Sequence, residues 1–193
     1  DIKEALENSL VSYEYLENPE KEAAQSIANN KIIGWFQGKM EFGPRALGNR
    51  SILADPRDPD MKNKINKLIK HREWYRPIAP SVLQEFQEEF FETNQKVPFM
   101  EKVAGIKAEK QKLIPAVVHE DGTGRLQTIG KKENPRYWKL IDEFRKITNV
   151  PIVLNTSFND NDEPIVCMPK DAIRSFFGTG LHELYIGNYR VKK

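Results

Sequence analysis

The chain has 193 residues, of which 39% are hydrophobic and 30% are charged, and its formal net charge is +2. This length suits one globular domain, and the balance of apolar and charged residues excludes a disordered or low-complexity chain. No apolar run approaches the roughly 18–20 residues of a transmembrane helix, and the single cysteine, Cys167, excludes an internal disulfide and is typical of a cytoplasmic protein.

The first half of the chain alternates helix and strand signals. The start, residues 1–4, resembles neither a signal peptide nor an initiator, so we expect a fragment, with residues 1–17 forming an arm against a partner domain. Asn18-Pro19 predicts a helix start, because Asn is a favoured cap and proline suits the first helical position. A buried strand is predicted over 32–36. Asp58-Pro59 repeats the start signal before an apolar stripe at Met61, Ile65, Leu68 and Ile69.

The second half continues this alternation. Residues 113–119 and 125–129 flank a turn-rich loop and are predicted to form an antiparallel pair. The polar run 155–159 directly follows an apolar strand predicted over 151–154. A helix is expected from Pro169 to Phe177 and a last strand over 184–186. The third cap-plus-proline signal, Asn134-Pro135, precedes an apolar stripe at Tyr137, Leu140, Ile141, Phe144 and Ile147.

Interleaved helices and strands predict an α/β or α+β fold with a mixed sheet, in a single domain over 1–193. Charge is uneven along it: between Lys31 and Arg76 there are eleven Lys or Arg against five Asp or Glu, a local surplus of six. Such a stretch suits a phosphate-bearing partner, whether a nucleotide, a small phosphate or a nucleic acid, although from charge alone a solvated basic face is the favoured explanation.

Four polar clusters lie where predicted elements end, at 41–51, 70–77, 119–127 and 155–159. In the first, glycines bracket Arg45 and Arg50, so the backbone can approach a ligand while two guanidinium groups bind phosphate oxygens in pairs. The Gly-Lys-Ser/Thr ending of a phosphate-binding P-loop is absent. On residue types alone, the clusters at 41–51 and 119–127 also fit structural turns, and the cations at 70–77 also fit the C-terminal end of a helix, where they oppose its dipole.

Other chemistries are disfavoured by the same residues. The Gly-x-Ser-x-Gly signature of serine hydrolases is absent. Three adjacent residues, 119–121, seldom ligate one ion, so no metal site is predicted. Cys167 has no cationic neighbour before Lys170 and is predicted to be a buried thiol. His71 is expected to be a surface or supporting residue rather than a base.

Taken together, the clusters resemble the C-terminal domain of the NodU/TobZ-type carbamoyltransferase family. Sixteen consecutive residues, 38–53, match its signature, as do 70–77, 119–127 and 155–159, and the resemblance extends from about residue 24 to 191. Two positions depart from the pattern: Asp162 stands where a glycine is expected, and His182 where relatives often have an acidic residue.

The resemblance implies a YrdC-like fold, a mixed twisted sheet flanked by helices. It further implies a cytoplasmic O-carbamoyltransferase whose C-terminal domain converts carbamoyl phosphate and ATP, with Mg²⁺ held mainly by the nucleotide, into carbamoyl-adenylate. An actin-like N-terminal domain of the same enzyme would then pass the carbamoyl group to a hydroxyl of a small-molecule acceptor, as in nodulation factors or antibiotics.

Site residues follow from the same motifs. The carbamoyl-phosphate cradle would comprise Arg45, Lys70, Arg76, Arg125 and Ser157, with substrate or nucleotide contacts from Arg50, Asn155, Thr156 and Asn159. Two alternatives remain: an RNA-binding YrdC-like module without catalysis, and a structural lid for the N-terminal domain. Few aromatic residues accompany the basic stretch, so nucleic acid is not the expected partner.

Overall fold

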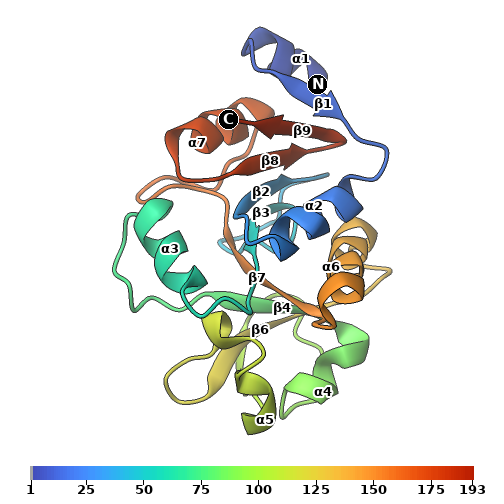
Figure 1. Cartoon of the computed structure of the whole chain (residues 1–193), viewed down its shortest axis with the longest axis vertical. Helices are drawn as coiled ribbons and strands as arrows, with labels where there is room; N and C mark the ends of the chain where they lie inside the picture. Colours follow the sequence, from blue (N-terminus) through green and yellow to red (C-terminus); the bar gives the residue numbers. More distant parts are fainter. Residues whose placement is uncertain (1) are drawn as a thin grey trace.

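The computed structural model describes residues 2–193, which form an α/β fold around one nine-stranded mixed sheet (Figure 1). The strand order is β1-β9-β8-β2-β3-β7-β4-β6-β5. Two neighbouring pairs, β2–β8 and β4–β6, are parallel, and the other pairs are antiparallel. The strands are β1 Tyr13–Tyr15, β2 Ile33–Phe36, β3 Arg50–Ala54, β4 Ala79–Leu83, β5 Lys102–Gly105, β6 Thr123–Ile129, β7 Ile152–Ser157, β8 Glu183–Ile186 and β9 Tyr189–Lys192.

Helices flank the sheet. In Figure 1, α3 and α7 lie to the left of the strands and α2 and α6, which pack against each other, lie to the right. Within residues 2–193, no helix has the length and hydropathy that a membrane span requires. The helices are α1 Ile2–Asn8, α2 Pro19–Ala28, α3 Met61–Leu68, α4 Gln87–Phe90, α5 Ala108–Gln111, α6 Pro135–Thr148 and α7 Pro169–Gly178, with 3₁₀ turns at Gln84–Phe86 and Pro115–Val117.

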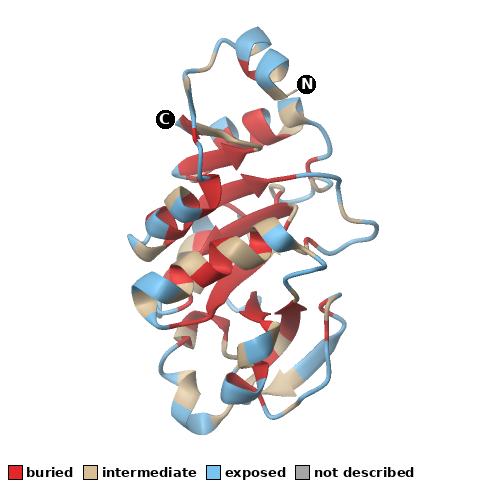
Figure 2. Cartoon of the chain, turned by 90° about the vertical axis from the view of Figure 1, so that its right-hand side faces the viewer, coloured by how far each residue is buried: buried red, intermediate tan, exposed pale blue. Residues whose placement is uncertain are grey.

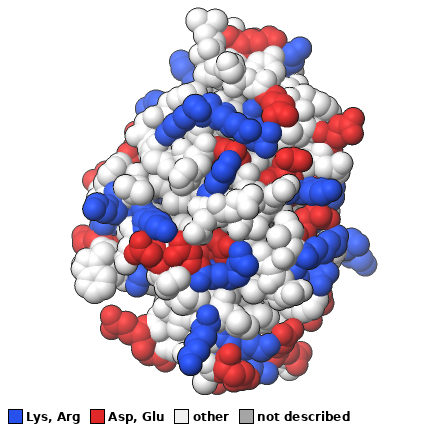
Figure 3. Space-filling view, viewed as in Figure 1, with Lys and Arg blue, Asp and Glu red and all other residues white. Residues whose placement is uncertain are grey.

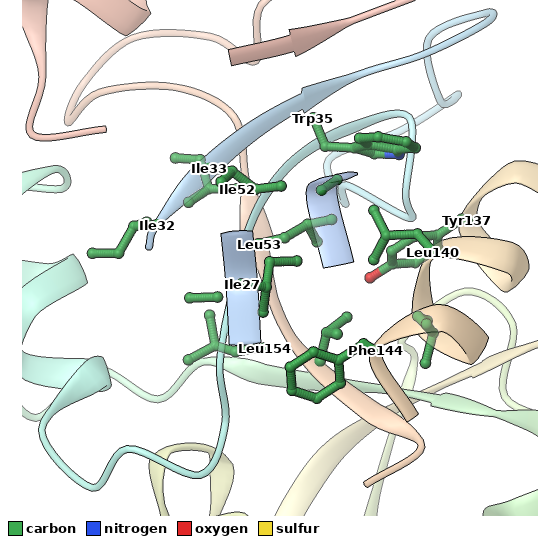
Figure 4. Packing of buried hydrophobic residues seen from close by; sticks show 14 of the residues in the cluster. Ile27, Ile32, Ile33, Trp35, Ile52, Leu53, Tyr137, Leu140, Phe144 and Leu154 are labelled. Carbon is green, nitrogen blue, oxygen red and sulfur yellow. The ribbon is translucent and has the colours of Figure 1, made fainter. Parts of the chain in front are cut away.

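The core lies between the sheet and these helices. Figure 2 shows the buried residues concentrated along the strands and on the helix faces that meet them. Side chains of α2 and α6, including Ile27, Leu140 and Phe144, meet the strand residues Leu53 and Leu154 (Figure 4), and all five are fully buried. The apolar stripes explain this packing, because each helix turns its hydrophobic face toward the sheet and so buries those side chains away from water.

Of the predicted helices, α2, α6 and α7 are confirmed, and at α6 the Asn134 side chain accepts a hydrogen bond from the Tyr137 amide at 3.2 Å. Two start signals were wrong in detail. The Asn18 side chain makes no capping bond and accepts instead from Lys139 Nζ at 3.3 Å. The third helix, α3, begins at Met61 rather than after Asp58, because Asp58 closes a turn by accepting from the Asp60 amide.

The strand predictions over 113–119 and 184–186 need correction. Residues 113–119 are not a strand but contain a 3₁₀ turn, since Pro115 has no amide hydrogen for a ladder. The partners of β6 are β5 and β4. The strand over 184–186 is confirmed as β8 but is followed by β9. Residues 155–157 continue β7 rather than following it.

The N-terminal residues 2–17 contribute to the sheet. They form α1 and β1, and β1 pairs with β9 at one edge of the sheet, with Glu14 opposite Arg190. The Glu14 carboxylate accepts from Arg190 Nη2 at 2.6 Å across this pair. The segment therefore extends the sheet by one strand.

Gly48, in the loop between β2 and β3, is required by its surroundings. Its φ is +108°, and a Cβ atom there would lie 2.1 Å from Cδ1 of the fully buried Tyr137. We expect Gly48→Ala to lower the free energy of unfolding by about 2–4 kcal/mol, from backbone strain together with overpacking. Urea denaturation would measure it. Gly43→Ala is the matched control, because Gly43 has a φ of +114° but open space around it; an equal loss in both variants would contradict the packing argument.

Candidate functional site

A polar cavity of about 240 Å³ opens at the ends of the central strands β3, β7, β4 and β6. Its walls combine four arginines with the polar end of β7 and contain no carboxylate. Segments far apart in sequence are adjacent here, so all four sequence clusters contribute residues to the lining, the cluster at 119–127 through Arg125 of β6. The cavity is lined by Pro44, Arg45, Ala46, Arg72, Arg76, Pro77, Met100, Arg125, Asn155, Thr156 and Ser157.

The loop between β2 and β3, which presents Arg45, is held by one carboxylate oxygen. Glu41 Oε1 accepts from the backbone amides of Leu47 at 2.7 Å, Asn49 at 2.8 Å and Arg50 at 3.2 Å. A carboxylate that accepts hydrogen bonds from several backbone amides holds those amides in one arrangement and so fixes the loop. The backbone at Arg45 and Ala46 is thereby placed against the cavity.

The loop between α3 and β4 is ordered by Asn66, a fully buried residue at the end of α3. Its Nδ2 donates to the carbonyls of Trp74 at 3.1 Å and Arg76 at 2.9 Å, while its Oδ1 accepts from Arg72 Nε at 2.8 Å. One amide side chain therefore positions both arginines that this loop contributes to the cavity.

The electrostatics of the cavity favour an anion. Among the described residues, the side chains of Arg45 and Arg125 have no ion pair or hydrogen bond, and Arg125 Nε is buried without a partner. Burial, and then the charges of Arg45 and Arg72, lower the pKa of Arg125. Burial followed by the charge of Arg76 lowers the pKa of Arg72. Within residues 2–193, Arg76 is the one arginine of the cavity lining with a carboxylate partner, Glu73 at 2.8 Å. Guanidinium groups that repel one another in this way are stabilised by a multivalent anion.

Lys70 does not line the cavity but lies behind it, and only 3% of the residue is exposed. Its Nζ lies within 2.5 Å of Ser157 O, 3.2 Å of Ser157 Oγ, 2.8 Å of Asn159 O and 2.6 Å of Asn159 Oδ1. Burial, and then the charge of Arg72, lower the pKa of Lys70 to about 7. Lys70 thus ties the end of β7 to the loop that follows it and sets the position of Ser157.

Two other residues predicted to contact ligand also lie outside the cavity lining. Arg50 is buried, stacks 3.5 Å from the centre of the Phe36 ring, and donates to the carbonyls of Gln37, Asn49, Gly38 and Cys167. Asn159 accepts from Lys70 and from Ser157 Oγ at 2.7 Å. Both residues hold loops that border the cavity.

A second cavity, of about 370 Å³, adjoins the first, since Pro77 lines both. Its walls include Tyr75, Ile78 and Val118, together with Lys62 and His119. The His119 Nδ1 atom is paired with Thr123 Oγ1 at 3.0 Å, and its Nε2 is buried without a partner. Burial lowers the pKa of His119. The two cavities together offer a charged chamber beside a more apolar one.

Several smaller expectations can be compared with the structure. Cys167 is exposed, so the prediction of a buried thiol was wrong; its amide and that of Met168 bond to Asp171 at the start of α7, which leaves the thiol outside the core. Asp162, where a glycine was expected, has a φ of +58°, a conformation that glycine adopts freely. Within residues 2–193, no group of three His, Cys, Asp or Glu side chains is placed to hold a metal ion.

Sequence reasoning missed Arg72, Met100 and the ordering role of Asn66. Arg72 belongs to the cluster at 70–77, but Lys70 was selected in its place for the cradle. His71 between them has a φ of +42°, and this turn directs Lys70 inward and Arg72 into the cavity. Met100 comes from a segment without a polar motif, so no local signal marked it.

Solved structures with the same architecture identify the fold. Sua5 of P. abyssi complexed with L-threonine aligns with 88% of this chain and 46% of its own, at a TM-score of 0.60 and 14% identity. Full-length HypF in its phosphate- and nucleotide-bound form aligns with 86% of this chain and 21% of its own, at a TM-score of 0.58 and 16% identity. The chain therefore has the YrdC-like α/β fold that the sequence predicted.

Within this class the chain belongs to the carbamoyltransferase C-terminus family, whose model matches residues 24–193. It is 50% identical over 198 residues to the nodulation protein NolNO of Sinorhizobium fredii, covering 98% of this chain and 29% of that protein. It is 52% identical over 174 residues to NolO of Bradyrhizobium diazoefficiens, covering 89% and 32% respectively. The chain thus spans about a third of the length of these relatives.

Proposed function

We propose that this chain binds carbamoyl phosphate and ATP and forms carbamoyl-adenylate, as the C-terminal part of an O-carbamoyltransferase. The observation that carries the proposal is the cavity with four arginines, two of them unpaired, and no carboxylate. A phosphate dianion supplies the missing countercharge, and Thr156 adds a hydroxyl donor, whereas Ser157 already donates its hydroxyl hydrogen to Asn159 Oδ1. Membership of the carbamoyltransferase family supports a carbamoyl donor. The similarity to the nodulation proteins NolNO and NolO supports a hydroxyl acceptor.

The nucleotide requires more room than the arginine cavity offers. Ligand pockets usually measure about 300–1,000 Å³, whereas this cavity measures about 240 Å³. The adjoining cavity of about 370 Å³ has the apolar wall that a nucleoside needs, at Tyr75, Ile78 and Val118. We therefore place the nucleoside there and the reacting phosphates at the arginines. The described lining of the arginine cavity has no carboxylate for Mg²⁺, whereas Glu120 and Asp121 line the adjoining cavity. At the arginines, Mg²⁺ would be held by triphosphate oxygens and water.

The proposed reaction has two substrates besides water and three products. Forming carbamoyl-adenylate from carbamoyl phosphate and ATP releases one phosphate and one pyrophosphate and consumes one water. Water would first cleave carbamoyl phosphate to carbamate and phosphate, and a carbamate oxygen would then attack the α-phosphorus of ATP and expel pyrophosphate. Both steps place new negative charge on the phosphorus-bound oxygens of the leaving group, and the arginines would stabilise that charge without a covalent intermediate on the protein. In the relatives, the carbamoyl group would then reach its acceptor hydroxyl on the portion that precedes this chain.

The test is direct: the chain is incubated with carbamoyl phosphate, ATP and Mg²⁺, and phosphate and pyrophosphate are measured separately. We expect equal amounts of the two, each dependent on both substrates, and calorimetric binding of each substrate alone. Folded protein that binds neither would overturn the proposal. Binding of both without pyrophosphate release would overturn adenylate formation by this chain and leave a binding domain that needs the preceding portion.

The alternative of RNA binding gains less support. RNA-binding surfaces concentrate unpaired Lys and Arg on one face, whereas the face in Figure 3 intersperses both signs of charge. Several cations of the basic stretch are paired with carboxylates, as in Lys31–Glu183, Arg57–Asp55 and Lys64–Asp58. The unpaired arginines lie in the cavity, where a small anion reaches them.

A further inference from the structure

His71 lies in the chain between a buried cation and a cation of the arginine cavity. Lys70, on one side, is 3% exposed and contacts the end of β7, and Arg72, on the other side, lines the cavity. The φ of His71 is +42°, a left-handed conformation that residues other than glycine rarely adopt, so contacts on either side must hold this turn. The proposed reaction gives His71 no role, yet its backbone sets where both cations point.

The turn is joined to the loop after β7 at two successive residues. Lys70 Nζ lies 2.6 Å from Asn159 Oδ1, and His71 Nδ1 lies 2.9 Å from Asp160 Oδ1. Because Arg72 lines the cavity from the turn and the end of β7 lines it from the other segment, these contacts hold two walls of the cavity together. The first contact is buried, whereas 53% of the His71 side chain and 31% of the Asp160 side chain are exposed. Solvent protons therefore reach the second contact directly.

The charges around His71 come from these two segments. Its own turn contributes the cations Lys70 and Arg72, and the facing loop contributes the carboxylate of Asp160. Burial acts against ionisation, but the bond to His71 and then the Asn161 amide lower the pKa of Asp160 overall. The negative charge of Asp160 reaches Lys70 and favours its protonated form. The other carboxylates of the two segments have partners of their own: Asp162 with Asn161, Glu163 with Arg174, and Glu73 with Arg76.

The protonation of His71 changes the charge that faces the cavity. An imidazole titrates between about pH 5 and 8, where a carboxylate such as that of Asp160 stays ionised. Protonated His71 compensates the charge of Asp160 and forms a charge-assisted bond between the two segments. Neutral His71 forms a weaker bond and leaves the negative charge facing Lys70 and Arg72, where it opposes an anion in the cavity. Both effects have the same sign, so anion affinity falls as pH rises through the titration of His71.

We propose that the His71–Asp160 pair is a pH-sensitive clamp, which strengthens anion binding in the arginine cavity when His71 is protonated and weakens it when His71 is neutral. The inference rests on the proposed function in that the cavity binds an anion. Linkage requires the reciprocal effect, that a bound anion holds the proton on His71 more tightly. A half-exposed ion pair supports a coupling of about two- to fivefold in affinity.

The first experiment measures the dissociation constant of sulfate by calorimetry at about pH 5.5 and about pH 8.5. Sulfate is the probe because it stays a dianion over this range, whereas phosphate groups lose a proton near about pH 6. Between the two pH values, we expect wild type to lose about two- to fivefold more affinity than His71→Gln or Asp160→Asn. Lys70, whose pKa is about 7, titrates in all these chains, so the comparison between chains isolates the pair.

The matched control is His182→Gln, since His182 is an exposed histidine outside the cavity lining. It should keep the full pH response of wild type. The same comparison with inorganic phosphate serves as a second probe, because the titration of the ligand cancels between chains at equal pH.

The second experiment uses the wild-type chain alone. The titration midpoint of the His71 ring proton, followed by NMR, should rise by about 0.3–0.7 pH unit in saturating sulfate, which is the same two- to fivefold coupling. The resonance of His71 is identified by its absence from the spectrum of His71→Gln. The midpoint of His182 should not move.

The outcomes separate the inference from the function beneath it. Equal pH responses in wild type and both variants, with anion bound, overturn the inference and leave the proposed function standing. A full response retained in Asp160→Asn also overturns it, because His71 would then act by its own charge alone. An unmoved His71 midpoint in the anion-saturated wild-type chain overturns it whether or not the variants fold. Binding of none of sulfate, phosphate and carbamoyl phosphate by the folded wild-type chain overturns the proposed function itself.

Discussion

Replacing Arg125 with alanine is expected to weaken the binding of carbamoyl phosphate roughly 30- to 1,000-fold, the equivalent of about 2–4 kcal/mol for a buried charge pair. Arg125 extends from β6 into the cavity, and its side chain has no partner among residues 2–193. Its charge is therefore available to the ligand in full. Calorimetry with carbamoyl phosphate and with inorganic phosphate measures the loss, which should be similar for the two anions.

The same substitution should not lower stability. Burial and the charges of Arg45 and Arg72 depress the pKa of Arg125, so its removal relieves repulsion in the chain without ligand. We expect Arg125→Ala to unfold at the same urea concentration as wild type or a higher one. Arg145→Ala, which removes an arginine paired with Asp142 on α6, is the control and should leave anion affinity unchanged. Loss of stability with unchanged affinity in Arg125→Ala would make Arg125 a structural residue.

Replacing Lys70 with methionine is expected to lower the free energy of unfolding by about 3–5 kcal/mol, because four oxygens of Ser157 and Asn159 lose their shared donor in a buried position. Methionine keeps the volume of the side chain, so the effect reports on hydrogen bonding rather than on a cavity. Urea denaturation measures it. Lys146→Met, on the exposed surface of α6, provides the control and should change stability by less than about 1 kcal/mol.

The difference in the free energy of unfolding between wild type and Lys70→Met (the stability gap) should also depend on pH. The pKa of Lys70 is about 7 in the folded chain, against an ordinary value of 10.5. Between these values the unfolded chain holds a proton that the folded chain has released, so stability rises with pH across this window. The methionine variant lacks this contribution, and the gap should widen from pH 7 to pH 10. A constant gap would show that the four oxygens keep Lys70 protonated.

The sequence predicted elements that local chemistry determines. Asn134-Pro135 started α6 as expected, because a cap and a proline act within one turn. The predicted strand over 113–119 was wrong, since an apolar run fits a 3₁₀ turn as well as a ladder and Pro115 decided between them. The α/β class followed from the alternation of helix and strand signals, whereas the order of the nine strands depends on pairings between distant segments.

For the site, the sequence identified the clusters but not every orientation. Arg45, Arg76, Arg125 and Ser157 line one cavity, as the predicted cradle requires, whereas Lys70 lies behind it and Arg72 lines it instead. That exchange depends on the left-handed backbone at His71 and on the contacts of Asn66, neither of which a motif reveals. Whether these residues bind carbamoyl phosphate stays a prediction.

The sheet order has a thermodynamic consequence. The cavity is lined mainly by β6, by the end of β7 and by the loops that precede β3 and β4. These four strands are neighbours in the sheet, and the lining residues range from 44 to 157 in the chain. No partial structure retaining only one or two of these strands contains the binding site, so ligand affinity is lost when any of them detaches. Bound anion therefore suppresses local opening anywhere among the central strands, and amide hydrogen exchange should slow there as a block while the β1 edge is unaffected.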